Sequence, residues 1–262
     1  MTKLWQEMTS EELEIAKDND SVIIIPIAST EQHGLHLPTG TDTFLVYDIV
    51  KDTVEKLADR RTIYTLPVWT GYSAHHMDFN GTITIDLKLF INIINSICLS
   101  IYKHGFKRIV LLNGHGGNIN VLKSICVELK SKYNLRPVTF SYWDIVADYI
   151  DKWKESEPRG MDHSGECETS LMMYKHDDLV RKNKFVSATP HIKSKFLGKD
   201  TILQGPVFVP YDVKEVTGSG VLGEPNASTR KKGKDLYIKI IDTLIEFLRE
   251  FQNWDIDNPK NL

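Results

Sequence analysis

Apolar residues recur along the chain in two patterns, and their alternation predicts strands that are followed by helices. Short runs rich in Val, Ile and Leu have the length of buried strands, whereas longer segments repeat their apolar residues at helical spacing. The predicted strands are residues 22–28, 63–68, 108–112 and 138–142. The predicted helices are residues 43–57, 89–104, 119–133 and 229–251. This order indicates an α/β fold of three α-β-α layers, with a mainly parallel sheet and helices on both faces.

Local signals add detail to this outline. Thr9-Ser-Glu-Glu12 is a capping box that predicts a short helix, and Gly105 is a residue type that ends helices. Residues 82–85 are expected to form a short strand, whereas residues 181–227, rich in Gly, Pro and Thr, are expected to be irregular. No repeat, low-complexity tract or linker divides the sequence, so residues 1–262 are expected to form one domain.

Composition narrows the class of protein. The 262 residues are 41% hydrophobic, which is enough for one large core. The formal net charge is -3 and no basic block is interleaved with aromatic residues, so nucleic acid is not an expected partner. The N-terminus has no apolar signal segment, and no apolar stretch reaches the roughly 20 residues that span a bilayer. No membrane partner is therefore expected.

Cysteine usage bears on the compartment. The chain has three cysteines, Cys98, Cys126 and Cys167, an odd number without a Cys-x-x-Cys spacing. This usage is typical of a reducing environment, so a cytoplasmic protein is expected.

The loop after the first predicted strand carries the most distinctive chemistry. Residues 29–42 hold two carboxylates and two histidines among turn residues, with Glu31, His33 and Asp42 as the main candidates. Open parallel sheets hold their active sites at the carboxyl ends of strands, and mixed carboxylate and imidazole ligands suit zinc, manganese or iron. The alternative is a polar surface loop in which Asp42 is a helix N-cap.

Two later segments have the same character. Asn113-Gly-His-Gly-Gly-Asn118 follows the third predicted strand and matches neither a P-loop nor a dinucleotide site, so His115 is favoured as a ligand or catalytic group. His163, Glu166 and Glu168 lie at a predicted helix start. Acidic capping explains one glutamate there, but it does not explain a histidine at the positive end of a helix.

Together these segments resemble the creatininase (creatinine amidohydrolase) family. The matching pieces are Glu31-Gln-His-Gly-x-His-Leu-Pro-x-Gly-Thr-Asp42, Asn113-Gly-His-Gly-Gly-Asn118 and His163-x-Gly-Glu-x-Glu-Thr-Ser170. Two further stretches are similar, namely Gly71-Tyr-Ser-x-x-His76-x-x-Phe-x-Gly-Thr82 and the late turn Gly220-Val-Leu-Gly-Glu-Pro225. The resemblance runs in order through most of the chain and implies a creatininase-like fold.

The resemblance also implies a cofactor, two divalent metal ions per chain. By resemblance, Asp42 bridges both ions, Glu31 and His115 complete one site, and His33 belongs to the other. Two metals lower the pKa of bound water toward neutrality and polarise the carbonyl under attack.

Other residues are expected to handle the substrate. An amide nitrogen needs a proton to depart, so His163 is expected to be the catalytic acid, with a metal ligand or a structural histidine as the alternatives. His76 and Trp143 are expected to contact the substrate. His36 is expected to contact a metal-binding residue or the substrate and not to bind a metal itself.

The sequence departs from creatininase itself at two places. Creatininase carries a glutamate ligand in its version of the Asn-Gly-His loop, where this chain has Gly117. Glu166 is expected to take the missing place as fifth ligand, and Glu168 is the competing candidate. Creatininase also has a tryptophan before the third motif, whereas residues 157–161 contain none. Both departures count against creatinine itself as the substrate.

The expected function is that of a metal-dependent amidohydrolase. It would cleave a non-peptide C–N amide bond in a small cyclic or formylated metabolite. The alternative is a hydrolase that opens a cyclic diketone at a C–C bond in inositol-type catabolism, and a binding protein without catalysis is disfavoured because the candidate ligands are retained. A homohexamer is expected by resemblance to the family, together with the apolar excess of residues 89–104.

Overall fold

Four parallel strands form the centre of the protein. The computed structural model describes residues 3–157, 159–189, 194, 196–197, 206–258 and 260. The strands are β1 (Val22–Ile27), β2 (Thr62–Tyr64), β3 (Arg108–Asn113) and β4 (Val138–Ser141). They lie in the order β2-β1-β3-β4, and every neighbouring pair is parallel. Parallel strands need crossover connections, and here helices provide them.

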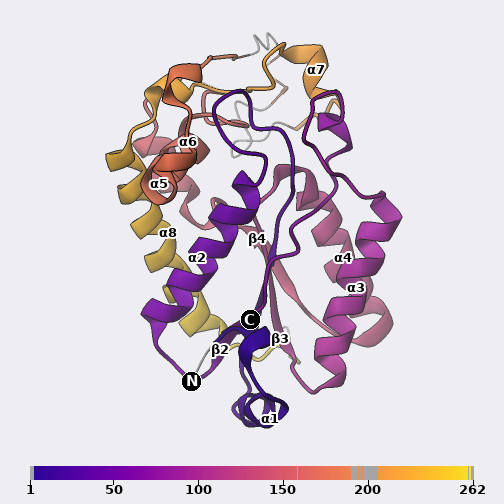
Figure 1. Ribbon diagram of the computed structural model, residues 1–262. Helices are drawn as coiled ribbons and strands as arrows, with labels where there is room; N and C mark the ends of the chain where they lie inside the picture. The colour runs from indigo at the N-terminus through magenta and orange to yellow at the C-terminus, as the bar shows by residue number, and fades with distance from the viewer. Residues whose placement is uncertain are drawn as a thin grey trace.

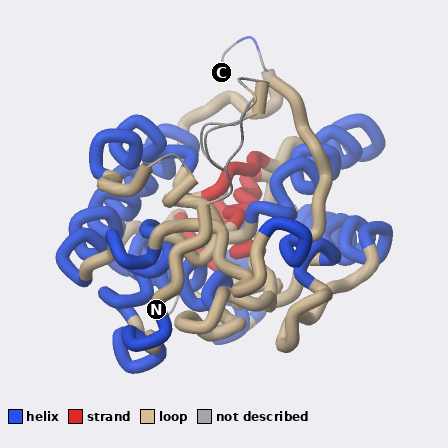
Figure 2. Tube along the Cα trace, turned by 90° about the horizontal axis from the view of Figure 1, so that it is seen from above, coloured by secondary structure: helices blue, strands red, loops and turns tan. Residues whose placement is uncertain are grey.

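Helices cover both faces of this sheet (Figure 1). One layer contains α2 (Thr41–Leu57), α5 (Ala147–Trp153), α6 (Glu166–Lys175) and α8 (Arg230–Phe251). The other contains α1 (Ser10–Asp18), α3 (Leu87–Lys103) and α4 (Ile119–Tyr133). Figure 2 shows the strands between the two groups of helices, with loops above them. The predicted three-layer α/β fold is confirmed.

Short helical segments lie mainly in the connections. They are α7 (Val213–Val216) and the 3-10 segments η1 (Trp5–Glu7), η2 (Ala74–His76), η3 (Gly116–Asn118), η4 (Asp144–Val146), η5 (Asp177–Leu179), η6 (Lys182–Lys184) and η7 (Pro225–Ala227). None of the described helices is long and apolar enough to cross a membrane.

Successive residues of the central strands supply two separate cores. Ile24 and Val110 are fully buried against the α2 and α8 layer. Ile23 and Ile109, the preceding residues, are fully buried against the α3 and α4 layer. Strand side chains point alternately to opposite faces, so a strand covered on both faces must be apolar throughout. This explains the continuous apolar runs in the sequence.

Two predicted strands differ from the structure. The strand expected over residues 63–68 ends at Tyr64, because Pro67 has no N–H to donate to the ladder. The N–H of Thr65 still donates to the carbonyl of Ile24 at 3.0 Å, and the next hydrogen bond to β1 comes from the N–H of Val68, which donates to the carbonyl of Pro26 at 2.9 Å. Residues 82–85 form isolated bridges and no strand, since Ile83 pairs with Thr30 in one loop and Thr84 with Gly71 in another.

Candidate metal centre

Loops from both central strands converge at the carboxyl end of the sheet. Glu31 and His33 lie in the loop after β1, and Asp42 lies in the first turn of α2, whose N-cap is Gly40. His115 follows β3 directly. Strands β1 and β3 pair in register up to Ile27 and Asn113, so both loops leave the sheet at the same edge. The four side chains are thereby brought together and buried.

Asp42 lies between two histidines. Its Oδ1 is 3.0 Å from Nε2 of His33, and its Oδ2 is 3.2 Å from Nδ1 of His115. The same His115 nitrogen is 3.2 Å from Oε2 of Glu31. One carboxylate therefore faces a different imidazole with each of its oxygens.

His33 is oriented by the backbone. Its Nδ1 donates to the carbonyl of Glu31 at 3.0 Å, which leaves Nε2 to face Asp42 and, at 3.7 Å, Oε2 of Glu168. Glu168 in turn accepts the N–H of Ser164 at 2.7 Å. Glu168 is thus the residue through which the motif at residues 163–170 contacts the loop at residues 29–42.

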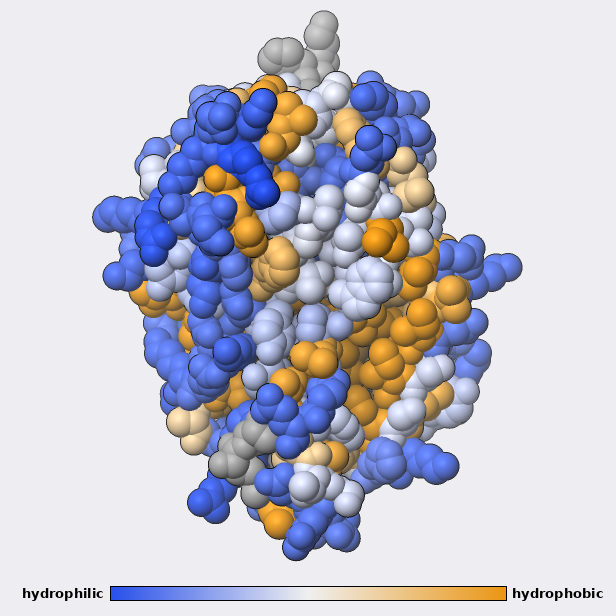
Figure 3. All heavy atoms as spheres, viewed as in Figure 1, coloured by the Kyte–Doolittle hydropathy of each residue, from blue (hydrophilic) through white to orange (hydrophobic). Residues whose placement is uncertain are grey.

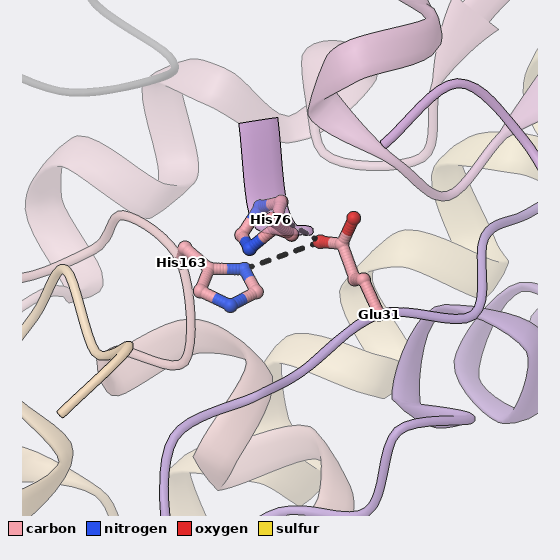
Figure 4. Close-up of side chains that lie close together, drawn as sticks. All are labelled: Glu31, His76 and His163. Atoms are coloured by element: carbon pink, nitrogen blue, oxygen red, sulfur yellow. Dashed lines mark ion pairs between the residues drawn. The ribbon is translucent and has the colours of Figure 1, made fainter. Parts of the chain in front are cut away.

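Glu31 also meets two further histidines (Figure 4). Its Oε1 is 3.4 Å from Nε2 of His76 and 3.4 Å from Nδ1 of His163. His163 Nε2 lies 2.7 Å from the backbone oxygen of Gln32, so Nε2 carries the donated proton and Nδ1 faces Glu31. The carboxylate–histidine cluster consists of Glu31, His33, Asp42, His76, His115, His163 and Glu168.

Gln32 and Ser73 hold this cluster, and the sequence analysis did not single them out. The side-chain amide of Gln32 donates to Nδ1 of His76 at 2.9 Å and to the carbonyl of Gly220 at 2.9 Å. The Ser73 hydroxyl donates to Glu31 Oε2 at 2.7 Å. Each is a member of a stretch that matches the family, and this membership is the sequence signal that marks them.

The charges within the cluster separate the histidines into two kinds. Burial alone would lower the pKa values of His33 and His115, but Asp42 and Glu31 raise them, that of His115 to about 10. Burial holds the pKa of His163 well below its usual range, with the neighbouring His33 adding to the effect. Burial likewise lowers the pKa of His76 to about 4. The first pair favours positive charge beside its carboxylates, and the second favours neutral imidazole.

Glu166 is not brought to this cluster, in contrast to its expected role as a ligand. Its carboxylate accepts the backbone N–H groups of Glu155 at 3.0 Å and Ser156 at 2.9 Å, and it pairs with Lys232 of α8. Two residues along a helix turn the side chain by about 200°, so Glu168 faces the cluster and Glu166 faces α8.

Trp143 and His36 also lie away from the cluster. Trp143 is buried in the apolar core with its ring 4.7 Å from that of Tyr142, and no described contact joins it to the cluster. His36 is fully buried and its Nε2 lies 2.9 Å from Oγ1 of Thr169 on α6. The expected substrate contact of Trp143 is therefore not supported by the geometry.

The donor set fits divalent metal ions. Three groups of residues have all their candidate donor atoms within 4.8 Å of one another, namely Glu31, Asp42 and His115; His33, His163 and Glu168; and Glu31, His76 and His163. Nε2 of His33 and Oδ2 of Asp42 are buried, and each faces a charged group of the cluster, at 3.0 Å and 3.2 Å respectively, without the geometry of a hydrogen bond. Buried polar atoms are rarely left without partners, and mixed oxygen and nitrogen donors suit zinc, manganese or iron.

Comparison with known proteins decides the family. The family model described as creatininase, creatinine amidohydrolase, matches residues 6–248. The chain belongs to the creatininase family. The expectation drawn from the three motifs is confirmed, because this match spans all of them.

Relatives within the family have different names. Creatinine amidohydrolase of Pseudomonas putida is 27% identical over 253 residues, which is 88% of this chain and 90% of the relative. A mycofactocin precursor peptide peptidase of Mycolicibacterium smegmatis is 26% identical over 234 residues, 88% of this chain and 85% of the relative. A 3-dehydro-scyllo-inosose hydrolase of Thermotoga maritima is 26% identical over 261 residues, 94% and 82% respectively.

Solved structures of the family share the fold. A structure described as creatininase Mn has a TM-score of 0.78 and 25% identity, covering 95% of this chain and 98% of that one. A creatininase variant described as Zn-Zn type has a TM-score of 0.77 at 25% identity over the same shares. The chain is accordingly an enzyme of the hydrolase class.

Proposed function

We propose that this protein is a dinuclear metal-dependent amidohydrolase that cleaves a non-peptide C–N amide bond in a small cyclic or formylated molecule. The position of Asp42 carries this proposal. Its two oxygens face His33 at 3.0 Å and His115 at 3.2 Å, the arrangement that a carboxylate needs to bridge two ions. A carboxylate can bridge because it has two oxygens, whereas an imidazole presents one nitrogen to one metal.

The remaining donors divide between the two sides of Asp42. Glu31 and His115 would hold one ion with it, and His33 and Glu168 would hold the other. Glu168 replaces Glu166 in this assignment because it is the glutamate of the third motif that approaches His33.

The chain's own groups would handle the proton and orient the substrate. Bound divalent ions supply a deprotonated water near neutral pH and polarise the carbonyl. His163 presents Nδ1 to the centre because its Nε2 is occupied by the Gln32 carbonyl. This Nδ1 would accept a proton and deliver it to the departing nitrogen. His76, which faces the same oxygen of Glu31 as His163, would contact the substrate.

His163 also meets the geometric requirement for a metal ligand, since it belongs to two of the three donor groups. His163→Ala separates the two roles. If His163 is the proton donor, the variant keeps two ions per folded chain and its turnover falls by about 10²–10⁴-fold. If His163 is a metal ligand, the metal content of the variant falls together with its activity.

A second candidate is hydrolysis of a C–C bond in a cyclic diketone. The relative from Thermotoga maritima, which is named as an inosose hydrolase and aligns with 94% of this chain, favours it. The same residues would hold the ions, and the bond broken would be a C–C bond beside a ring carbonyl in place of an amide C–N bond. The peptidase relatives make a peptide amide the third possibility to be tested.

Metal analysis tests the shared part of these candidates. We expect two divalent ions per chain in protein purified with zinc, manganese or iron, and loss of both in Asp42→Ala. Asp242→Ala is the matched control, because Asp242 lies on the exposed part of α8 beside Lys56, and it should keep both ions. Two tightly held ions in Asp42→Ala would exclude the bridging role.

A substrate panel tests the reaction itself. The panel contains creatinine, hydantoin and dihydrouracil as cyclic amides, N-formylglycine as a formamide, a short peptide, and cyclohexane-1,3-dione. We expect turnover of a cyclic or formylated amide that disappears in the Asp42→Ala variant. Turnover of the diketone alone would establish the second candidate, and turnover of the peptide alone would contradict the non-peptide specificity.

A further inference from the structure

Gly117 lies against two histidines, His115 of its own loop and His75 of another loop. A Cβ atom at position 117 would lie 2.4 Å from Nε2 of His115, 2.6 Å from the carbonyl oxygen of Tyr72 and 2.9 Å from Cε1 of His75. Real Cβ atoms essentially never approach so closely, so this position accepts only glycine while His115, the Tyr72 carbonyl and His75 keep their places.

His75 lies beside the metal centre without belonging to its donor groups. Its ring is centred 4.4 Å from the ring of His76 and 5.9 Å from that of His115, to which it is nearly parallel at 20°. None of the donor groups found among the described residues contains it. The side chain therefore flanks the centre beside His76 and His115.

Both ring nitrogens of His75 are free to bind another molecule. No described residue hydrogen-bonds to them, and neither is among the buried atoms that lack a partner. The nitrogens are therefore reached by solvent, unlike Nε2 of His33. An imidazole fixed by packing and open at its nitrogens is suited to bind a polar group of a substrate.

The segment that carries His75 is held in place from outside. Helix α7 packs on η2, and Nζ of Lys214 lies 4.6 Å from the centre of the Phe79 ring. His75 therefore needs little ordering when a ligand binds, which favours affinity.

We propose that His75 is a substrate-binding residue of this centre, which hydrogen-bonds the carbonyl, amide or hydroxyl group adjacent to the bond that is cleaved. This inference rests on the proposed function, because it takes the neighbouring cluster as the reacting centre. It adds a contact next to His115 to the expected contact of His76.

His75→Ala tests the proposal with two readouts. For each amide of the panel that the parent protein cleaves, we expect KM to rise about tenfold, the usual effect of one lost hydrogen bond. The value of kcat should change by less than threefold, because the contact is made in the bound substrate and in the transition state alike. His75→Asn, which keeps a donor and an acceptor, should restore part of the loss.

The second readout is the Kd of acetohydroxamate, measured by calorimetry on the metal-loaded protein. Acetohydroxamate is a small chelating anion whose polar atoms extend from a metal centre. We expect this Kd to rise about tenfold in His75→Ala and to stay unchanged in His104→Ala, where the histidine is exposed after α3. Two ions per chain should remain in both variants.

Three outcomes would overturn the inference. These are an unchanged KM in His75→Ala with an active parent protein, an unchanged Kd of acetohydroxamate, and loss of metal from His75→Ala, which would make His75 a ligand. If the parent protein cleaves no member of the panel, the proposed function fails, and the acetohydroxamate measurement still decides the role of His75.

Discussion

Glu166 and Glu168 are two positions apart at the start of α6, and their side chains have separate partners. Glu168 approaches His33, whereas Glu166 joins Lys232 to the backbone of Glu155 and Ser156. Burial would raise the pKa of Glu166, but the ion pair with Lys232 and the backbone N–H groups lower it. The Glu166 carboxylate thus stays charged in the interior and ties α6 to α8.

The two glutamates should respond to neutralisation in opposite ways. Glu166→Gln leaves Lys232 without its buried partner, so we expect the free energy of unfolding to fall by about 3 kcal/mol while two ions stay bound. Glu168→Gln should lose at least one ion and change the stability of the metal-free protein little. Urea unfolding in EDTA and elemental analysis give both quantities. Loss of metal from a folded Glu166→Gln protein would return the ligand role to Glu166.

His36 gives the metal-free protein a dependence on pH. Burial and the nearby His33 lower its pKa to about 4, whereas an unfolded histidine titrates near about 6.5. Neutral His36 therefore contributes stability that is fully present above pH 6.5 and is lost as the pH falls toward 4. His76, whose pKa is also lowered to about 4, adds to the loss in the same window.

We expect the unfolding free energy in EDTA to fall less steeply between pH 6.5 and 4 in His36→Gln than in the parent chain. The difference should be on the order of 2 kcal/mol, because a shift of one pKa unit corresponds to about 1.4 kcal/mol. Urea titrations at several pH values measure it. Equal slopes in the two proteins would mean that His36 does not titrate in this window.

At the residue scale, the sequence predicted which loops meet at the site better than it predicted which side chains face the site. Parallel strands end at one edge, so the meeting of the loops with Glu31 and His115 could be anticipated. The choice between Glu166 and Glu168 could not, because it depends on how far α6 rotates against α8. The close approach of His75 to Gly117 is likewise set by two loops far apart in sequence.

Helices α6 and α8 are held together at a glycine. A Cβ atom on Gly233 would lie 1.8 Å from the backbone oxygen of Ser170 and 2.4 Å from its carbonyl carbon. The glycine stands in the first turns of α8, within the sequence Arg230-Lys-Lys-Gly-Lys234. It is buried in the structure and sets the distance between the two helices.

Gly233→Ala should therefore destabilise the protein although alanine is the better helix former. Helix propensity alone predicts a gain of about 1 kcal/mol, but overpacking costs typically about 1–3 kcal/mol, and a contact with rigid backbone places this site at the upper end. We expect a net loss in urea unfolding, with weaker metal binding because α6 carries Glu168. Gly218→Ala is the control, since nothing lies within 4 Å of its added Cβ. A stabilised Gly233→Ala protein would contradict this packing.

The predicted boundaries of helices and strands agree with the structure where the sequence shows one clear pattern of apolar residues or capping residues. The helix predicted over residues 119–133 is α4 (Ile119–Tyr133), and the predicted capping box at Thr9 is present at the start of α1. Helix α2 starts two residues earlier than predicted, at Thr41, which places Asp42 inside its first turn. The apolar run over residues 63–68 could not show where β2 ends. Its end depends on Pro67, which interrupts the hydrogen bonds between β2 and β1.

At the scale of the whole molecule, apolar side chains are exposed on the surface of the layer that contains α3. Figure 3 shows them gathered over the part of the face that α3 occupies in Figure 1. Leu89 is 50% exposed in this helix, while Ile94 and Cys98 on the opposite side are buried in the core. Leu87, in the first turn, is 37% exposed. The apolar excess noted in the sequence thus serves the core in part and leaves a remainder at the surface.

This remainder is where we expect subunits to meet. The homohexamer expected by resemblance to the family would have a mass of about 180 kDa, six times the 30.0 kDa of one chain. A buried glutamate without a partner is strongly disfavoured, so Leu89→Glu should shift the protein toward smaller species in light scattering at micromolar concentration. Ile15→Glu on α1 is the matched control, because Ile15 is also 50% exposed, and it should leave the mass unchanged. A monomeric parent protein would rule out the hexamer, and a hexameric Leu89→Glu protein would place the contact elsewhere.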